Sequence, residues 1–102
     1  MKVKINLLKE TISVLLRFEK TPEDVLWVGN FKEWETWENF VNSATNFEYD
    51  PESEIAEIDT TLKIVGDNWW LEREEYDGSE WWAFKTLPDL PDEEVSYLEL
   101  KR

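Results

Sequence analysis

The sequence predicts an α+β fold: an antiparallel sheet of four to five strands, with an N-terminal helix packed on it and a second short helix. Three observations predict it. Apolar residues near the N-terminus recur with helical spacing, β-branched and aromatic runs occupy the second half, and an Asp-Gly pair separates two of these runs. The chain has 102 residues, of which 41% are hydrophobic and 15% aromatic, enough to build one core. We therefore expect residues 1–102 to form a single acidic domain.

The first predicted element is an amphipathic helix over residues 4–19. Charged residues separate its apolar side chains, which are Ile5, Leu8, Ile12, Leu15 and Leu16. Several β-branched residues leave a strand over part of residues 12–18 as the alternative. Residues 21–24, which include Pro22, indicate a turn or a single capped helical turn.

Two short strands are expected to follow. Residues 25–28 have the composition of a buried strand, which Gly29 and Asn30 close. We expect residues 31–35 to return beside it as a short second strand.

The middle of the chain predicts a short helix and then a loop. Thr36 can cap a helix that ends near Ala44 and whose inner face holds Trp37, Phe40 and Val41. Residues 45–54 are rich in turn formers and predict a loop. Residues 55–59 fit either a helical turn or an irregular segment.

The strongest local signal is a β-hairpin over residues 69–87. Asp77-Gly78 lies between two aromatic-rich runs, and a type I′ turn needs positive φ at both central positions. Residues 62–65 predict the strand before it, and Pro88 ends it. The alternating residues 95–100 are expected to add a last edge strand.

Two tryptophan pairs, Trp69-Trp70 and Trp81-Trp82, lie on the two arms of this hairpin. Neighbouring residues of a strand point to opposite faces, so each pair places one ring on each face of the sheet. The second face is therefore either covered by another element or subunit, or it is an exposed aromatic patch that anchors a partner. A stacking platform for sugars or bases is a third reading, which the surrounding glutamates disfavour for nucleic acids.

The composition excludes several kinds of chemistry. The chain contains no Cys and no His, so it lacks the usual zinc ligands, Ser-His-Asp triads and Cys-His dyads. It also contains no Gly-rich phosphate loop and no G-x-S-x-G motif. We expect a binding protein that is not an enzyme and needs no cofactor. Charged residues interrupt the N-terminal apolar stretch, which predicts no membrane span and a cytoplasmic location.

Charge is the most informative feature for function. The formal net charge is −13, and residues 21–100 hold twenty-two of the twenty-four carboxylates beside only four basic side chains. Such a surface repels nucleic acid directly and attracts basic proteins. One acidic cluster, of Glu33, Glu35 and Glu38, surrounds two tryptophans. The residues proposed to bind a partner are those of the two other clusters together with one aromatic anchor: Glu48, Asp50, Glu52, Glu54, Glu57, Asp59, Glu72, Glu74, Glu75, Asp77, Glu80 and Trp34.

The spacing of these carboxylates indicates what they can imitate. Residues two apart on an extended chain place their side chains about 7 Å apart on one side, so a row of them can approximate a row of phosphates. A solvated surface that keeps the protein soluble is the alternative explanation. Carboxylates also alternate in residues 50–54 as in a calcium loop, but Ile55 and Thr61 stand where that loop needs Gly and Glu, so no metal site is predicted.

The stretches DVLWVGN (residues 24–30) and IVGDNWWLEREEYDGSEWWAFKTLP (residues 64–88) resemble small acidic proteins encoded by phages and mobile elements of Gram-positive bacteria. That resemblance covers about two thirds of the chain and implies no activity. In composition the chain is similar to anti-CRISPR proteins and other DNA-mimic inhibitors, which implies no residue roles.

The sequence leads to one functional hypothesis and two alternatives. In the first, the protein blocks a nucleic-acid-binding host enzyme by presenting a carboxylate face to its basic groove. In the second, it is an interaction module without mimicry, such as an immunity-type protein that binds a basic toxin. In the third, it is a structural domain that oligomerises through its tryptophan-rich face.

Overall fold

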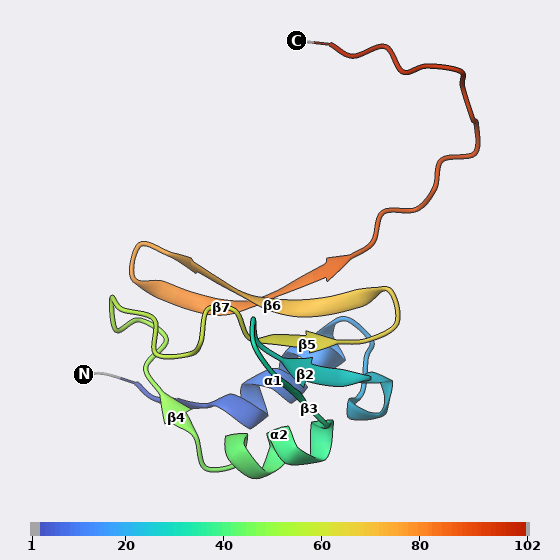
Figure 1. The fold of residues 1–102 in the computed structure, drawn as a ribbon. Helices are drawn as coiled ribbons and strands as arrows, with labels where there is room; N and C mark the ends of the chain where they lie inside the picture. Colours follow the sequence, from blue (N-terminus) through green and yellow to red (C-terminus); the bar gives the residue numbers. More distant parts are fainter. Residues whose placement is uncertain (1–2, 102) are drawn as a thin grey trace.

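The computed structural model, which describes residues 3–101, confirms the α+β fold (Figure 1). A five-stranded antiparallel sheet has the order β3-β2-β5-β6-β7, and β1 and β4 form a separate two-stranded sheet. In chain order the elements are β1 (Ile5–Asn6), α1 (Leu7–Arg17), the 3-10 helix η1 (Pro22–Asp24), β2 (Trp27–Gly29), β3 (Trp34–Glu35), α2 (Trp37–Ala44), β4 (Glu48–Tyr49), β5 (Lys63–Val65), β6 (Trp69–Tyr76) and β7 (Ser79–Thr86).

The hairpin of β6 and β7 forms as its sequence predicts. Tyr76 pairs with Ser79, so the loop between the strands has two residues. Asp77 has φ 49° and Gly78 has φ 86°, the positive values that a type I′ turn requires. The turn sets the register, which runs without interruption from Tyr76–Ser79 to Trp69–Thr86.

Helix α1 begins at Leu7, later than its apolar pattern indicates. The side chain of Asn6 accepts a hydrogen bond of 2.9 Å from the Lys9 N–H and caps the helix. Ile5 and Asn6 instead pair with Tyr49 and Glu48 as the strands β1 and β4. The alternative of a strand over residues 12–18 is wrong, because those residues continue the helix to Arg17.

Helix α2 confirms the expected cap and, of the expected inner face, Trp37 and Phe40; Val41 is half-buried and does not belong to the core cluster. The Thr36 hydroxyl accepts a hydrogen bond of 3.2 Å from the Asn39 N–H. Phe40 and Ala44 are buried, and Trp37 is half-buried against the core. The residues after Phe31 also confirm the short return strand, although only as Trp34–Glu35.

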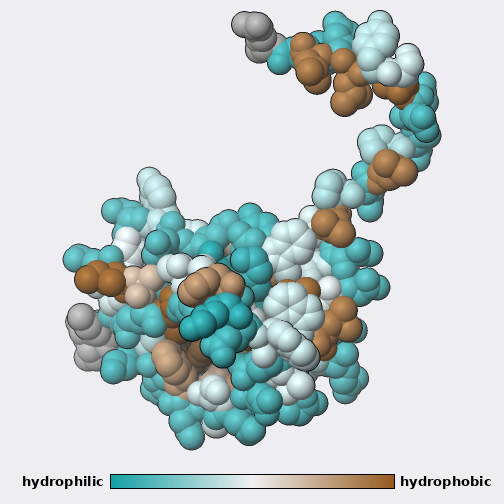
Figure 2. All heavy atoms as spheres, viewed as in Figure 1, coloured by the Kyte–Doolittle hydropathy of each residue, from teal (hydrophilic) through white to brown (hydrophobic). Residues whose placement is uncertain are grey.

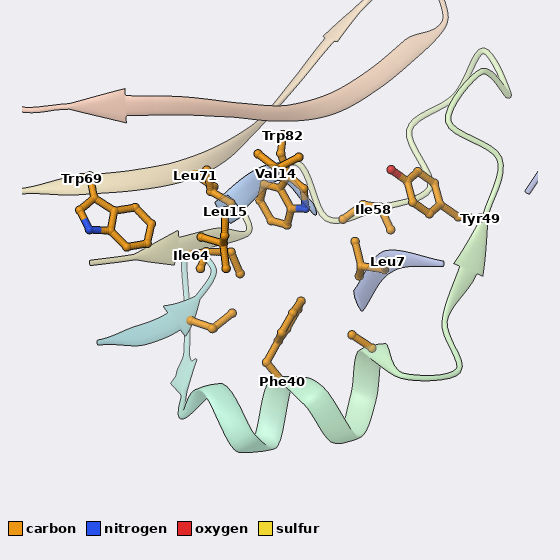
Figure 3. Close-up of a cluster of buried hydrophobic side chains, with 12 residues drawn as sticks. Leu7, Val14, Leu15, Phe40, Tyr49, Ile58, Ile64, Trp69, Leu71 and Trp82 are labelled. Carbon is orange, nitrogen blue, oxygen red and sulfur yellow. The ribbon is translucent and has the colours of Figure 1, made fainter. Parts of the chain in front are cut away.

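Both helices cover the same face of the five-stranded sheet, and the core lies between them and that face (Figure 3). Leu15, Val28, Ile64 and Leu71 are fully buried there. We call the face of the five-stranded sheet that the helices cover the inner face, and the opposite face of this sheet the outer face. The core is lined by Leu7, Val14, Leu15, Phe40, Ala44, Tyr49, Ile58, Val28, Ile64, Trp69, Leu71 and Trp82.

Two expectations about irregular segments are wrong. Residues 45–54 are not all loop, because Tyr49 is fully buried and Glu48–Tyr49 pairs with β1. Residues 95–100 form no edge strand; they belong to a segment that leaves the body after β7 (Figure 1). Within the described residues, the last backbone hydrogen bond between this segment and the body is from the Leu87 N–H to the Asn68 carbonyl, just before Pro88.

None of the helices within residues 3–101 has the length and apolar character needed to cross a membrane.

The core makes a simple prediction about stability. Replacing the fully buried Leu71 with Ala removes apolar contacts and leaves a cavity, so we expect the free energy of unfolding to fall by about 2–5 kcal/mol. Leu90 is 92% exposed in the C-terminal segment, so Leu90→Ala is the matched control and should change this free energy by less than about 0.5 kcal/mol. Urea titration of both variants measures the difference, and equal losses would contradict the fold described here.

Candidate functional site

Two acidic clusters that are distant in the sequence meet at one end of the molecule. Residues 50–57 run past the tip of the β6–β7 hairpin (Figure 1). The Glu54 N–H donates a hydrogen bond of 3.2 Å to the Gly78 carbonyl, and the Glu80 N–H donates one of 2.9 Å to the Pro51 carbonyl. These two bonds hold the loop against the hairpin tip.

An open depression of about 290 Å³ lies where the loop and the hairpin tip meet. Glu54, Glu75 and Asp77 line it with exposed carboxylates, and neither Lys nor Arg is among its lining residues. Glu52 is exposed between the two points at which the loop is anchored. We call the four residues Glu52, Glu54, Glu75 and Asp77 the acidic end.

Two residues predicted to bind a partner are buried and do not belong to an exposed face. Glu80 is 6% exposed, and its carboxylate accepts hydrogen bonds from the Glu57 N–H (2.7 Å) and the Ile58 N–H (3.4 Å). Asp50 is also 6% exposed and accepts a hydrogen bond of 2.9 Å from the Glu52 N–H. The alternating pattern of the sequence cannot show this, because it does not reveal which carboxylates meet backbone donors.

The partner that draws Glu80 inward is Arg73, whose side chain is almost fully buried. Its Nη2 lies 2.9 Å from Glu80 Oε1 and donates a hydrogen bond of 3.1 Å to the Tyr49 hydroxyl. The guanidinium carbon lies 4.7 Å from the ring centroid of Trp82 and 5.5 Å from that of Tyr49. These aromatic faces and the carboxylate offset part of the cost of removing the cation from water, while Arg73 Nε and Nη1 find no hydrogen-bond partner among the described residues.

Glu10, on α1, completes this buried network. Its Oε1 accepts a hydrogen bond of 2.6 Å from the Tyr49 hydroxyl and lies 3.8 Å from Arg73 Nη1. Burial raises the pKa of Glu10 despite the Tyr49 hydroxyl and Arg73, both of which lower it. Burial also raises the pKa of Tyr49, and its hydrogen bond to Glu10 adds to this effect.

Two of the remaining predicted carboxylates, Glu57 at the end of the loop and Asp59 just after it, accept hydrogen bonds from nearby groups. Glu57 Oε2 accepts a hydrogen bond of 3.2 Å from the Asp50 N–H. Asp59 accepts hydrogen bonds from the N–H and the hydroxyl of Thr61, and these lower the pKa of Asp59. Glu48 is exposed on β4.

Glu72 and Glu74 lie on the outer face of β6, away from the core. Glu72 accepts a hydrogen bond of 2.6 Å from the Trp70 indole N–H. Glu74 forms an ion pair of 2.9 Å with Lys85, and this hydrogen bond raises the pKa of Lys85. These two carboxylates are therefore partly satisfied by their neighbours on the sheet.

The tryptophan pairs divide between the faces as their positions predict. Trp69 and Trp82 are buried on the inner face, whereas Trp70 is half-buried and Trp81 is 38% exposed on the outer face. Both helices lie on the inner face, so the described chain places no helix over these outer rings.

The outer face carries a second exposed aromatic site at its β3 edge. Trp34, predicted as an anchor, is 70% exposed and lines an apolar depression of about 360 Å³ with Trp27 and Leu26. The expectation that residues 25–28 are buried is wrong for these two residues, which are exposed, whereas Val28 is buried in the core and Val25 packs against it. Alternation of polar and apolar residues along the strand would have indicated which side chains are exposed. Residues 25–28 are all apolar, so the sequence shows no such alternation.

No group of Asp and Glu residues within the described range 3–101 is arranged to hold a metal ion. No protein family model matches this chain, and no curated protein or solved structure shows significant similarity to it.

The buried ion pair predicts an asymmetry between two glutamates. Glu80→Gln leaves Arg73 charged in the interior, so the free energy of unfolding should fall by about 3–5 kcal/mol. Glu74→Gln breaks an ion pair of half-exposed side chains and should cost no more than about 1 kcal/mol. Denaturant titration of both variants tests this, and a similar loss in each would show that Glu80 is not buried against Arg73.

The raised pKa of Glu10 predicts that the difference in free energy of unfolding between the wild-type protein and Glu10→Gln changes with pH. The unfolded chain releases the Glu10 proton at lower pH than the folded one, so the carboxyl favours folding below its unfolded pKa. That contribution is lost as the pH rises through the folded pKa. The free energy of unfolding of the wild type minus that of Glu10→Gln should therefore be smaller at neutral pH than in mild acid, as measured by urea titration. A larger difference at neutral pH would contradict the desolvation of Glu10.

Proposed function

We propose that this chain is an acidic binding protein that docks its acidic end into the basic groove of a nucleic-acid-binding enzyme and blocks it. One observation carries the proposal: the hydrogen bonds from Glu54 to Gly78 and from Glu80 to Pro51 bring exposed carboxylates of two clusters, Glu52 and Glu54 from one and Glu75 and Asp77 from the other, to a single end of the molecule. The third cluster, at Glu33–Glu38, adjoins β3, which lies at the sheet edge opposite β7, so it does not belong to that end.

The electrostatics of the acidic end suit a basic partner. Two carboxylates about 7 Å apart repel each other by roughly 0.6 kcal/mol in water, and a partner that supplies Lys or Arg side chains relieves this repulsion. The field of a chain with net charge −13 also raises the association rate with a cationic groove. The same field repels free nucleic acid. This supports binding to the groove of the target enzyme and not to the nucleic acid that the enzyme binds.

Aromatic residues next to the acidic end are suited to anchor that partner. Tyr76 is 77% exposed and lines the depression, and Trp81 is exposed on the outer face of the adjoining strand. Trp34 lies on β3, at the far edge of the sheet. Tyr76 and Trp81 therefore take the place of Trp34 as the proposed anchors at the acidic end, because large exposed aromatic rings dominate binding energies when they become buried.

A second candidate function is docking to a basic protein without mimicry, as an immunity-type protein does. The burial of Asp50 favours it, because that carboxylate leaves a gap in the alternating row that resembles phosphates. Under this alternative the partner is basic but its bound surface is not a nucleic-acid groove. Competition separates the two: added duplex DNA or RNA displaces a mimic from its target and leaves a non-mimic complex intact.

We predict that affinity for the partner depends on salt. Removing charge at the acidic end should weaken binding more than removing the same charge elsewhere. Capture on the immobilised protein from nuclease-treated bacterial lysate identifies a partner, and the purified partner is then titrated across a salt series. We expect affinity to fall as salt rises, and the triple change Glu54→Gln, Glu75→Gln and Asp77→Asn to weaken binding by roughly tenfold or more.

The matched control is Glu23→Gln, Glu33→Gln and Glu38→Gln, which removes the same charge from exposed residues away from the acidic end. It should weaken binding far less than the triple change at the acidic end. A response that does not vary with salt, or equal losses in the two triple variants, would refute the acidic end as the binding site.

A further inference from the structure

Strand β7 presents the one long free edge of the five-stranded sheet within the described residues. The opposite edge strand, β3, has only two residues. In the hairpin register, residues such as Ser79 and Trp81 exchange backbone hydrogen bonds with β6. The backbone N–H and C=O groups of the residues that alternate with them, such as Trp82, therefore point away from β6. The outward N–H of Glu80 already bonds to Pro51. The open part of the edge is therefore the five residues from Trp82 to Thr86.

An open edge of this kind is a ready template for another strand. Between Ser79 and Thr86 there is no proline to blunt it, and Lys85 is its only basic residue. The side chain of Lys85 is paired with Glu74 on the outer face. The edge thus offers unpaired backbone groups beside the half-buried ring of Phe84.

The C-terminal segment carries the complementary features. Residues 87–101 are exposed throughout and extend away from the body (Figure 1). Apolar side chains are spaced along it, apart from the core (Figure 2), and Leu90, Tyr97 and Leu100 are 81–92% exposed. Residues 95–100 have the alternating composition of a strand, yet residues 88–101 make no hydrogen bond within the described chain.

We propose that this protein forms a dimer in which residues 96–100 of each copy pair antiparallel with residues 82–86 of the other. The two segments have the same length, and the exchange is reciprocal, so a twofold axis closes the assembly and leaves neither edge open. The occupant of the β7 edge is thus a second copy of this chain.

The antiparallel register that pairs Leu98 with Phe84 also matches the chemistry of the two segments. Directly paired residues share a face, so Leu98 and Leu100 extend the core beside Phe84 and Trp82. Glu99 then lies on the outer face, diagonal to Lys85. A parallel arrangement would place Lys101 away from the hairpin tip, whereas the antiparallel one brings this cation towards the acidic end.

The prolines favour pairing between copies over folding back within one chain. Leu87 and Leu90 each precede a proline, which holds them extended. Folding back onto the same β7 requires the chain to reverse between Pro88 and Val95. Pairing with a second copy requires no reversal, and the seven residues 88–94 can span up to about 23 Å to reach it.

Light scattering across a concentration series from low micromolar to millimolar tests this proposal on the full chain. Moderate salt is used to screen repulsion between the acidic copies. We expect the weight-average mass to rise towards twice that of one chain. Leu98→Asp should raise the dissociation constant by roughly tenfold or more, and Leu90→Asp, which adds the same charge outside the paired segment, should change it by less than about threefold. Both side chains are exposed, so neither change threatens the fold of the body.

Amide hydrogen exchange supplies a second measurement, in which residues 96–100 should exchange more slowly as the protein concentration rises. The mass of a single chain at every concentration overturns the proposal. Slow exchange of this segment at that mass would identify folding back within one chain. A dimer that Leu98→Asp does not weaken would point to the tryptophans of the outer face as the interface. Partner binding at the acidic end is read from a different measurement, so failure of either proposal is recognised separately.

Discussion

The buried ion pair between Arg73 and Glu80 is the interaction on which the rest of the structure depends. Arg73 lies on β6 and Glu80 on β7, and α1 and β4 reach the same guanidinium through Glu10 and Tyr49. The Glu80 carboxylate also accepts the N–H groups of residues 57 and 58. One charged pair thus links the hairpin, the first helix, the small sheet and the loop. A buried pair of this kind adds little net stability compared with apolar side chains of similar size, but removing one partner is strongly destabilising.

That arrangement explains how a strongly acidic chain forms a core. A few carboxylates are taken inside and satisfied there: Glu80 by a cation and backbone donors, Asp50 by a backbone donor, and Glu10 by the Tyr49 hydroxyl. Others, such as those of Glu54 and Asp77, remain in water, where repulsion is weak. Anchoring the loop through Glu80 also brings Glu54 to the hairpin tip. The fold and the concentration of charge at one end therefore have the same physical cause.

The sheet has two faces of different character. The inner face is closed by both helices, and the outer face carries the exposed rings of Trp34, Trp81 and Trp27. Both short helices are used on one side of the five-stranded sheet, so neither is left to cover the other side. The uncovered face, the free edge of β7 and the exposed C-terminal segment all lie outside the core. They are the parts of the molecule that remain available for contacts with other chains.

Local sequence by itself determined the helices, most strands and the turn. Asp77-Gly78 and the cap at Thr36 act over a few residues, because each depends on backbone dihedral angles and on the direction of neighbouring side chains. The apolar spacing near the N-terminus indicated a helix but not its buried face, since Leu7, Thr11 and Val14 are buried and Leu16 is 57% exposed. Tertiary structure alone decided that β1 pairs with β4, that Asp50 and Glu80 are buried, and that residues 95–100 find no strand to pair with. Those outcomes depend on which groups meet across long separations. Alternation of residue types along a chain indicates which side chains share one face of a strand. It does not indicate which hydrogen-bond donor, cation or sheet edge those side chains will contact in the folded protein.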